Sequence, residues 1–241
     1  MHASGGSISN ATVNAGQLWR SPACWGWCGI VLGIQAWVAN AGGVGALQGV
    51  FEDLGLSRDG FLSGKIWQLI SYGFLHGAWW HAGLNALWVL VIGSRIEWMT
   101  GSVTMIRVTL AGVVGGGLCH LLLGSGLLVG LSGGCMALLL LLVTLSPQSR
   151  MWPLPVSGKS LGLGIMLVEL SLAMIDPALG LPGWSVAGRI LVDHGVGAWF
   201  QMGHACHFGG GLAGWLYGRW LLRSRVTLAH LRRDRARREV S

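Results

Sequence analysis

The chain has 241 residues, of which 52% are hydrophobic and only 10% are charged. A soluble domain carries about 25% charged residues, so this composition excludes a protein that faces water on all sides. The formal net charge of +7 is concentrated near the C-terminus rather than spread over one face, and we therefore predict no nucleic-acid partner.

Six apolar segments have the length of a membrane-spanning helix, which needs about 20 mostly apolar residues. They occupy residues 24–44, 78–97, 104–123, 131–147, 160–177 and 203–222. The sequence thus predicts an all-α, polytopic membrane protein built as a bundle of six transmembrane helices. Its parts are a polar cytoplasmic segment at 1–22, the six-helix transmembrane domain at 23–222 and a basic cytoplasmic tail at 223–241.

The connections between these segments differ in character. Residues 45–66 form a polar linker. Residues 67–77 mix aromatic and polar side chains, as expected of a segment at the membrane–water interface. Residues 148–159 form a proline-containing cytoplasmic turn, and residues 177–200 form a long outer loop before the last segment.

The basic residues predict the orientation in the membrane. With both termini in the cytoplasm, thirteen of the sixteen Lys and Arg residues lie on the cytoplasmic side, and three lie outside: Arg58, Lys65 and Arg189. This asymmetry is the one that membrane proteins show. We predict a multi-pass membrane protein, monomeric there, with its basic tail against the anionic lipid of the bilayer. If the chain has the bacterial origin that we infer, this is the bacterial inner (cell) membrane.

Glycines mark a place where two helices approach closely. Gly210, Gly214 and Gly218 recur every four residues in the last apolar segment and form a stripe without side chains. The predicted partner is the fourth segment, which offers Gly133 and Gly134 at the same membrane depth.

Four polar residues share one depth in this topology. His81 and Asn85 lie near the start of the second segment, Ser132 near the start of the fourth and His207 near the start of the sixth, and all three segments start at the outer face. Polar groups inside a bilayer are costly and are usually functional. A serine, a histidine and two hydrogen-bond donors are the groups that acyl transfer needs as nucleophile, base and oxyanion hole.

The motifs around these residues resemble those of the rhomboid family of intramembrane serine proteases. The resemblance covers roughly residues 65–220 and is carried by the following: Gly130-x-Ser132-Gly133, His81-x-x-x-Asn85, His207-x-Gly209-Gly210, Phe74-Leu75-His76 and Gly93-x-x-x-Glu97-x-x-x-Gly101. It implies cleavage of peptide bonds in or next to the transmembrane helices of single-span membrane-protein substrates.

The resemblance also implies a role for each residue. Ser132 is the expected nucleophile and His207 its general base, while Asn85 and His81 are expected to hold the oxyanion together with the Ser132 backbone N–H. Asp176 and Asp193 fall in loops, so a Ser–His dyad without a third, acidic member is the expectation.

Two positions depart from the family pattern. Trp67 is followed by Gln68 where the family often has arginine, so the first outer loop is expected to be held differently. Met136, four residues after the serine, replaces the aromatic residue that often stacks on the catalytic imidazole, and it can make only a softer sulfur–ring contact.

Other readings of the same residues remain. Ser132 alone can be a packing serine bonded to a carbonyl one turn back, and His204, Cys206 and His207 suggest a metal site; we predict neither a metal nor a cofactor. His76 and His120 are expected to be supporting residues. Glu169, in the middle of the fifth segment, is expected to be a neutral acid bonded to a neighbouring helix, with a proton-linked or gating role as the alternative.

Two rival functions also remain. One is an inactive rhomboid-like protein that binds transmembrane helices without cutting them, which would be expected to lack the serine or the histidine. The other is a small transporter, which would place its polar residues near the midplane of the bilayer.

Overall fold

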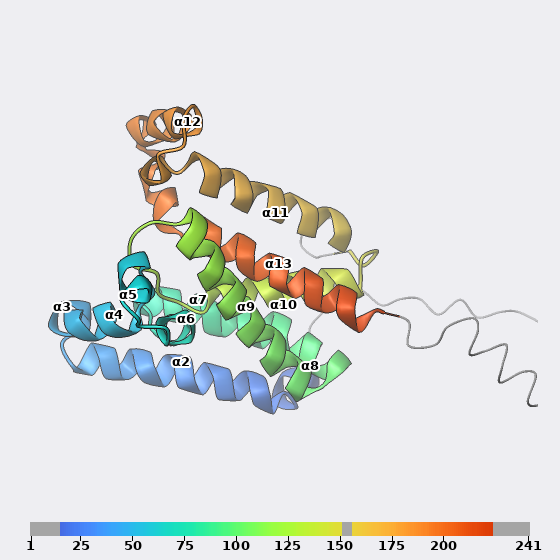
Figure 1. Ribbon diagram of the computed structural model, residues 1–241. Coiled ribbons are helices and arrows are strands. Elements are labelled where there is room, and N and C mark those ends of the chain that lie inside the picture. Colours follow the sequence, from blue (N-terminus) through green and yellow to red (C-terminus); the bar gives the residue numbers. More distant parts are fainter. Residues whose placement is uncertain (1–14, 151–155, 224–241) are drawn as a thin grey trace, which may run out of the picture.

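The computed structural model describes residues 15–150 and 156–223, and long helices dominate these parts of the chain. Five of them are α2 (Pro22–Asn40), α9 (Ser102–Leu123), α10 (Ser132–Leu145), α11 (Gly158–Ile175) and α13 (His204–Leu221), as Figure 1 shows. The sixth runs without a break through α7 (Trp79–Trp88), the π-helical η2 (Val89–Gly93) and α8 (Ser94–Thr100).

Each predicted apolar segment corresponds to one of these helices, so the predicted fold class is confirmed. By length and composition alone, three described helices suffice to cross a membrane: α2, α9 and α11. Helix α10 is also apolar but shorter, with 14 residues. The N-terminal segment is described only from residue 15, where α1 (Ala15–Trp19) begins, and most of the predicted basic tail lies outside the described residues.

The predicted linker and outer loop turn out to be largely helical. Helix α2 ends four residues earlier than predicted because Gly42 and Gly43 adopt φ angles of +96° and +80°. The following stretch folds into α3 (Gly43–Ala46), α4 (Gln48–Leu54), α5 (Arg58–Leu62), α6 (Gln68–Ser71) and η1 (Tyr72–Phe74). The outer loop likewise contains η3 (Pro177–Leu179), α12 (Trp184–Leu191), η4 (Val192–Val196) and η5 (Gly197–Gln201).

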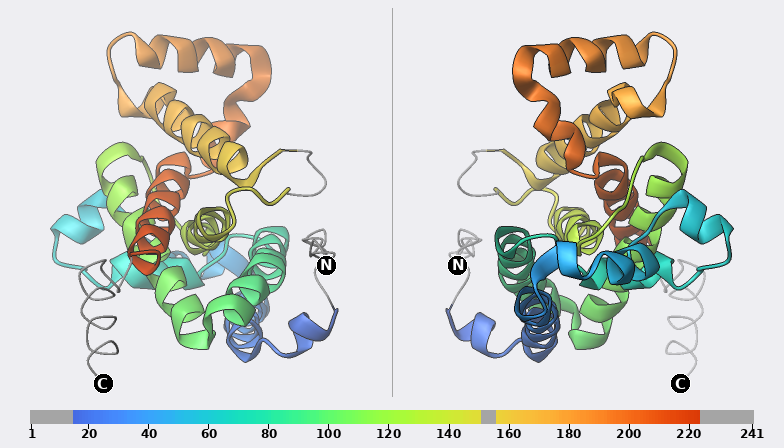
Figure 2. Two further views of the ribbon diagram at one scale, coloured as in Figure 1. Left: turned by 90° about the vertical axis from the view of Figure 1, so that its right-hand side faces the viewer. Right: turned by 90° about the vertical axis from the view of Figure 1, so that its left-hand side faces the viewer.

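Helix α10 is the centre of the bundle. Every residue from Gly133 to Val143 is buried, as expected of a helix that is apolar all round. Views along the bundle place α10 among the other helices (Figure 2), and it packs most extensively against α9 and α13.

Glycines allow this close packing, as predicted for Gly133, whereas Gly134 lies against Thr109 of α9 rather than against α13. A side chain at Gly210 would collide with the backbone of Gly133, and one at Gly214 would collide with the backbone of Ala137. Gly112 on α9 lies against Gly133 and Ala137 in the same way. The three helices α9, α10 and α13 therefore meet backbone to backbone at the depth where α10 begins.

A buried glutamate of α8 binds the start of α2 and the start of α9. Glu97 accepts hydrogen bonds from the backbone N–H groups of Ala23 and Cys24, both at 3.1 Å, and from Ser102 Oγ at 2.6 Å. A carboxylate at a helix N-terminus satisfies free N–H groups and matches the helix dipole.

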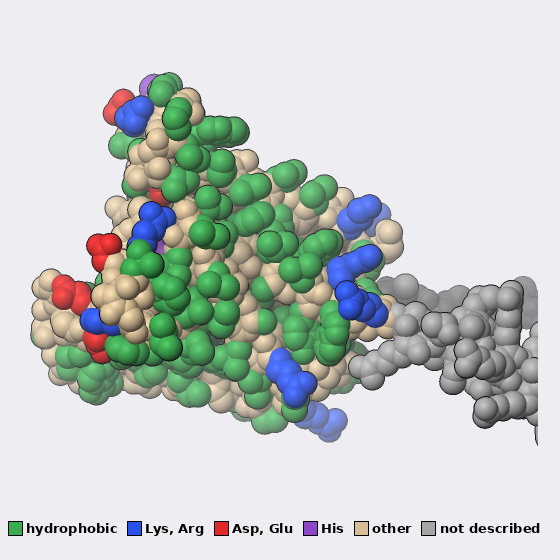
Figure 3. All heavy atoms as spheres, viewed as in Figure 1, with side chains coloured by type: hydrophobic (Ala, Val, Ile, Leu, Met, Phe, Trp, Pro, Cys, Tyr) green, Lys and Arg blue, Asp and Glu red, His purple; other side chains and the backbone are tan. Residues whose placement is uncertain are grey.

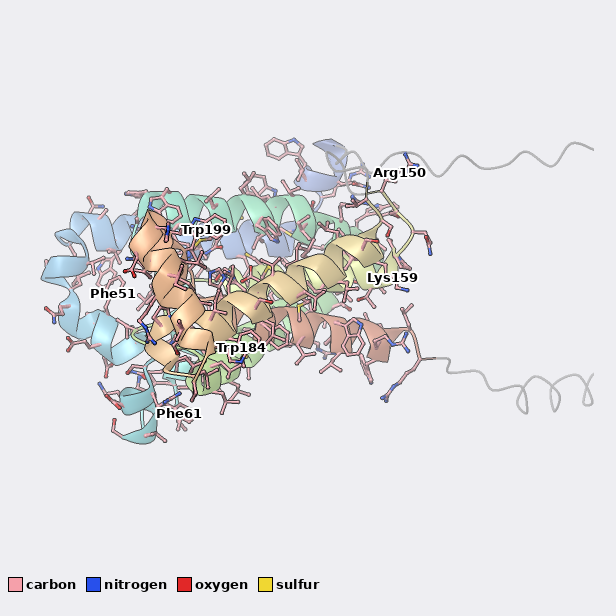
Figure 4. All side chains as sticks on the ribbon, turned by 90° about the horizontal axis from the view of Figure 1, so that it is seen from above. Phe51, Phe61, Arg150, Lys159, Trp184 and Trp199 are labelled. Carbon is pink, nitrogen blue, oxygen red and sulfur yellow. The ribbon has the colours of Figure 1, made fainter. Side chains whose placement is uncertain are left out.

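The two ends of the bundle differ in charge. Figure 3 shows apolar side chains over most of the face in view and basic side chains where α8 and α13 finish. The opposite end carries acidic side chains together with some basic ones. Arg150 and Lys159 lie at the basic end, whereas Phe51, Trp184 and Trp199 lie at the other (Figure 4). The charge pattern agrees with the predicted asymmetry between the two sides of the membrane.

Candidate active site

A cavity of about 800 Å³ lies at the end of the bundle where α7, α10 and α13 begin. Ser132, His207, His81 and Asn85, from three different helices, all line it. The structure thus brings together the four residues that the sequence analysis placed at one depth.

Ser132 is the first residue of α10, and its side chain is half-buried. The chain enters the helix through Gly130, whose φ of +117° favours glycine. The Gly130 N–H donates to the Tyr72 carbonyl at 2.9 Å, which ties the entry to η1. The first N–H groups of a helix have no intrahelical acceptor, so Ser132 lies among free donors that favour negative charge.

The packing of α13 on α10 sets His207 beside this helix start. Cys206 Sγ lies against Gly133, and Gly210 lies on the Gly133 backbone. His207 follows Cys206 directly, and Ser132 precedes Gly133 directly. The glycine contacts therefore fix the two residues on neighbouring helix ends around the same cavity.

Asn85 is held by two neighbours. Its Nδ2 donates to His76 Nε2 at 2.8 Å, and its Oδ1 accepts from Cys135 Sγ at 3.7 Å. His76 Nε2 also accepts from the Leu131 N–H at 3.4 Å. One of the two Asn85 amide hydrogens is used in this way, which leaves the second for a ligand in the cavity.

His76 must be neutral to accept these bonds. The side chain is buried, 1% exposed, and burial, helped by the nearby His81, lowers its pKa from 6.5 to about 4. The sequence analysis gave His76 a supporting role, and the structure shows its contacts: it orients Asn85 and the residue before Ser132.

His81 is packed between two rings. Its ring lies edge-on to His76, with centroids 4.8 Å apart, and stacks on Trp80 at 5.6 Å. A Cβ atom at Gly130 would be 2.7 Å from His81 Nε2 and 3.6 Å from Asn85 Nδ2. The absence of a side chain at Gly130 therefore lets both donors approach the start of α10.

The structure corrects one expectation, because an acid does stand beside His207. Glu169 of α11 places Oε1 at 3.3 Å from His207 Nδ1 and Oε2 at 2.7 Å from His204 Nδ1. The expected bond from Glu169 to a neighbouring helix is thus present. The expectation that no carboxylate lies beside the base was wrong, since it considered only Asp176 and Asp193.

The same three residues form a group of side chains that could hold a metal ion. One ligand atom each from Glu169, His204 and His207 lies within 4.8 Å of the others. Cys206, which the sequence grouped with the two histidines, faces Tyr72 and Gly133 instead. Hydrogen bonds occupy both carboxylate oxygens of Glu169 and both ring nitrogens of His204, the second through the Trp199 carbonyl at 2.8 Å.

Gln68, at the position where arginine was expected, bonds to the backbone of the first outer loop. It is fully buried. Its Nε2 donates to the Glu52 carbonyl at 3.0 Å, and its Oε1 accepts from the Ser57 N–H at 3.3 Å. Trp67 Nε1 adds a bond to the Asp53 carbonyl at 2.9 Å. These bonds hold the loop without an arginine at position 68.

Comparison with known protein families identifies the family of the chain. A search of curated proteins found no match to the chain. A family model described as the Rhomboid domain matches residues 63–224, which is more than half of the chain and contains all four predicted site residues. The motifs, the helical membrane bundle and this match lead to one conclusion: the chain belongs to the rhomboid family.

Proposed function

We propose that the protein is an intramembrane serine endopeptidase that hydrolyses peptide bonds in or next to transmembrane helices. The observation that carries the proposal is the cavity at the start of α10, which Ser132, His207, His81 and Asn85 all line. These residue types supply a nucleophile, a base and oxyanion donors.

In the proposed reaction Ser132 Oγ attacks the scissile carbonyl, and its proton passes to His207. The carbonyl oxygen becomes an oxyanion that the Ser132 N–H, the free Asn85 amide hydrogen and His81 stabilise. His207 then protonates the leaving amine, and a water molecule from the cavity repeats the sequence to release the acyl group. Because the donors are fixed by packing before the substrate arrives, little reorganisation is needed in the transition state.

The proposed substrates are single-span membrane proteins. A peptide bond inside an intact helix is protected, since its carbonyl is engaged in the hydrogen bonding of the helix. We expect cleavage next to small residues, in helices that contain glycine or other helix-weakening residues beyond the site.

The alternative is an inactive rhomboid-like protein that binds transmembrane helices. The presence of both Ser132 and His207 at one cavity favours the enzyme over this alternative. A transporter would hold its polar groups near the midplane, whereas these gather where three helices begin.

We further propose that the cavity opens to the outside of a bacterial inner membrane, that both termini are cytoplasmic and that the enzyme acts as a monomer. The basic end of the bundle, away from the cavity, supports this orientation (Figure 3).

A serine-directed fluorophosphonate tests the proposal without knowledge of the natural substrate. The purified protein in detergent should be labelled at Ser132, and labelling should be lost in Ser132→Ala and strongly reduced in His207→Ala. A wild-type protein that folds normally but takes up no label would favour the inactive alternative.

A further inference from the structure

Glu169 is an ionisable residue in the middle of the apolar helix α11. Helix α11 is the least buried of the long apolar helices, and Leu167 and Val168, next to Glu169, are exposed on it. An ionisable side chain at membrane depth is costly unless it is paired. Both oxygens of Glu169 are paired, and both partners are histidines of α13.

The hydrogen bonds of His204 require one proton more than a neutral histidine and a carboxylate carry together. Its Nε2 carries hydrogen, because the Trp199 carbonyl at 2.8 Å can only accept. The 2.7 Å contact between Nδ1 and Glu169 Oε2 therefore needs one further proton, shared between the two atoms. His204 and Glu169 together form a charge-compensated pair, which lowers the cost of placing the carboxyl group in the bundle.

The remaining oxygen determines which nitrogen of His207 is free. Glu169 Oε1, 3.3 Å from His207 Nδ1, accepts a hydrogen bond from it. Nδ1 then carries the hydrogen, and the lone pair lies on Nε2, the nitrogen on the other side of the ring. A general base must present that lone pair to the serine hydroxyl.

We propose that Glu169 is a positioning residue for His207, so that the site operates as a Ser–His–Glu arrangement steadied by His204. This inference rests on the proposed function. In the attack step the Ser132 proton moves to His207 Nε2 and the Nδ1 hydrogen stays in place; Glu169 holds the ring and stabilises the imidazolium that forms. The acid comes from α11, so the position of this outer helix controls the orientation of the base.

The experiment compares two hydrogen-bonded glutamates, the half-buried Glu169 and the buried Glu97. Glu169→Gln keeps the size of the side chain and places an amide hydrogen against one of the two histidines. Glu97→Gln makes the same change at the opposite end of the bundle, where the carboxylate bonds to helix α2. For each variant we would measure the rate of fluorophosphonate labelling of Ser132, kcat and KM on a transmembrane substrate, and the unfolding temperature.

Glu169→Gln should slow labelling and lower kcat at least about 10²-fold with little change in KM, since a wrongly held imidazole impairs proton transfer and not binding. Glu97→Gln should lower the unfolding temperature and leave the labelling rate of the folded protein unchanged. In a His207→Ala background, Glu169→Gln should cause no further loss of labelling rate or kcat, because the two residues act as a unit.

If Glu169→Gln does not fold, the shorter pair Glu169→Asp and Glu169→Asn replaces it, and the carboxylate variant should be labelled faster than its amide. Wild-type labelling that His207→Ala abolishes and Glu169→Gln leaves intact would overturn the role of Glu169 alone. A wild-type protein that is not labelled at Ser132 would overturn the proposed function as well.

Discussion

The hydrogen bonds around the Asn85 side chain define its proposed role. Its Nδ2 is held by His76 and its Oδ1 by Cys135, which leaves one hydrogen for the cavity. We predict that Asn85→Ala lowers turnover about 10²–10³-fold, the loss typical of one oxyanion donor. The binding of a helical substrate should change little, because the bond strengthens only in the transition state.

Turnover and thermal unfolding measured on the same preparations separate this role from packing. A hydrogen bond between membrane helices contributes about 0.6 kcal/mol on average. An Asn85→Ala protein with near-normal turnover and a clearly lower unfolding temperature would mean that Asn85 only joins helices. His81→Ala should act on turnover in the same direction but less, since Asn85 and the Ser132 N–H remain.

The buried His76 makes stability depend on pH in a defined direction. An unfolded histidine takes up a proton near pH 6.5, whereas in the folded protein the pKa of His76 is about 4. Between these values the unfolded state binds more protons, so stability falls as the pH is lowered from about 6.5 toward 4. The unfolding temperature of His76→Gln should fall less over this range than that of the wild type.

The comparison of the two proteins between pH 7.5 and 4.5 isolates His76, since the other histidines are present in both. Equal falls in unfolding temperature would show that His76 is not held neutral by its burial.

At the scale of single residues, the sequence predicted which side chains line one cavity but not all of their partners. Ser132, His207, His81 and Asn85 could be placed at one depth because alternate helices run in opposite directions. The pairing of Glu169 depends on how α11 packs against α13, which apolar segments alone do not determine. A signal was present nonetheless, because a carboxyl group in mid-helix needs a partner and His204 lies one turn from His207.

Between elements, the contact of α13 with α10 positions the site. We predict that Gly210→Ala lowers the free energy of unfolding by about 1–3 kcal/mol, because its methyl group would meet the Gly133 backbone. Turnover should also fall, by about 10²-fold, since the displaced Gly133 backbone would move Ser132 at the start of α10 out of place. Chemical unfolding and substrate cleavage measure the two effects.

Gly164→Ala is the matched control on α11, because a Cβ atom there meets nothing within 4 Å. It should leave turnover unchanged and stabilise the helix slightly, as alanine does in place of glycine. Equal effects of the two substitutions would show that the helix contact at Gly210 does not position the site.

The long helices were predictable, and the short ones were not. Hydropathy over about 20 residues identifies a spanning helix, but α3, α4 and α5 have only 4, 7 and 5 residues. Such short helices are marginal alone and are stabilised by packing. Contacts distant in sequence, such as those of Gln68 with the backbone of α4, hold this region.

For the whole molecule, the orientation in the membrane can be tested with two single cysteines. Four of the five native cysteines are buried, so their background reaction should be low. Arg58→Cys should react with a membrane-impermeant maleimide in intact spheroplasts, and Lys159→Cys should react only after permeabilisation. The reverse pattern would place the cavity on the cytoplasmic side.

The most direct test of the central claim is cleavage of a transmembrane substrate in liposomes. The purified protein is reconstituted with a single-span test protein whose helix contains glycine and alanine, and the products are identified by mass spectrometry. The account predicts two fragments cut in or next to the helix by the wild type and intact substrate with Ser132→Ala and His207→Ala. Equal cleavage by the wild type and Ser132→Ala, or no cleavage by a wild-type protein that binds the substrate, would contradict it.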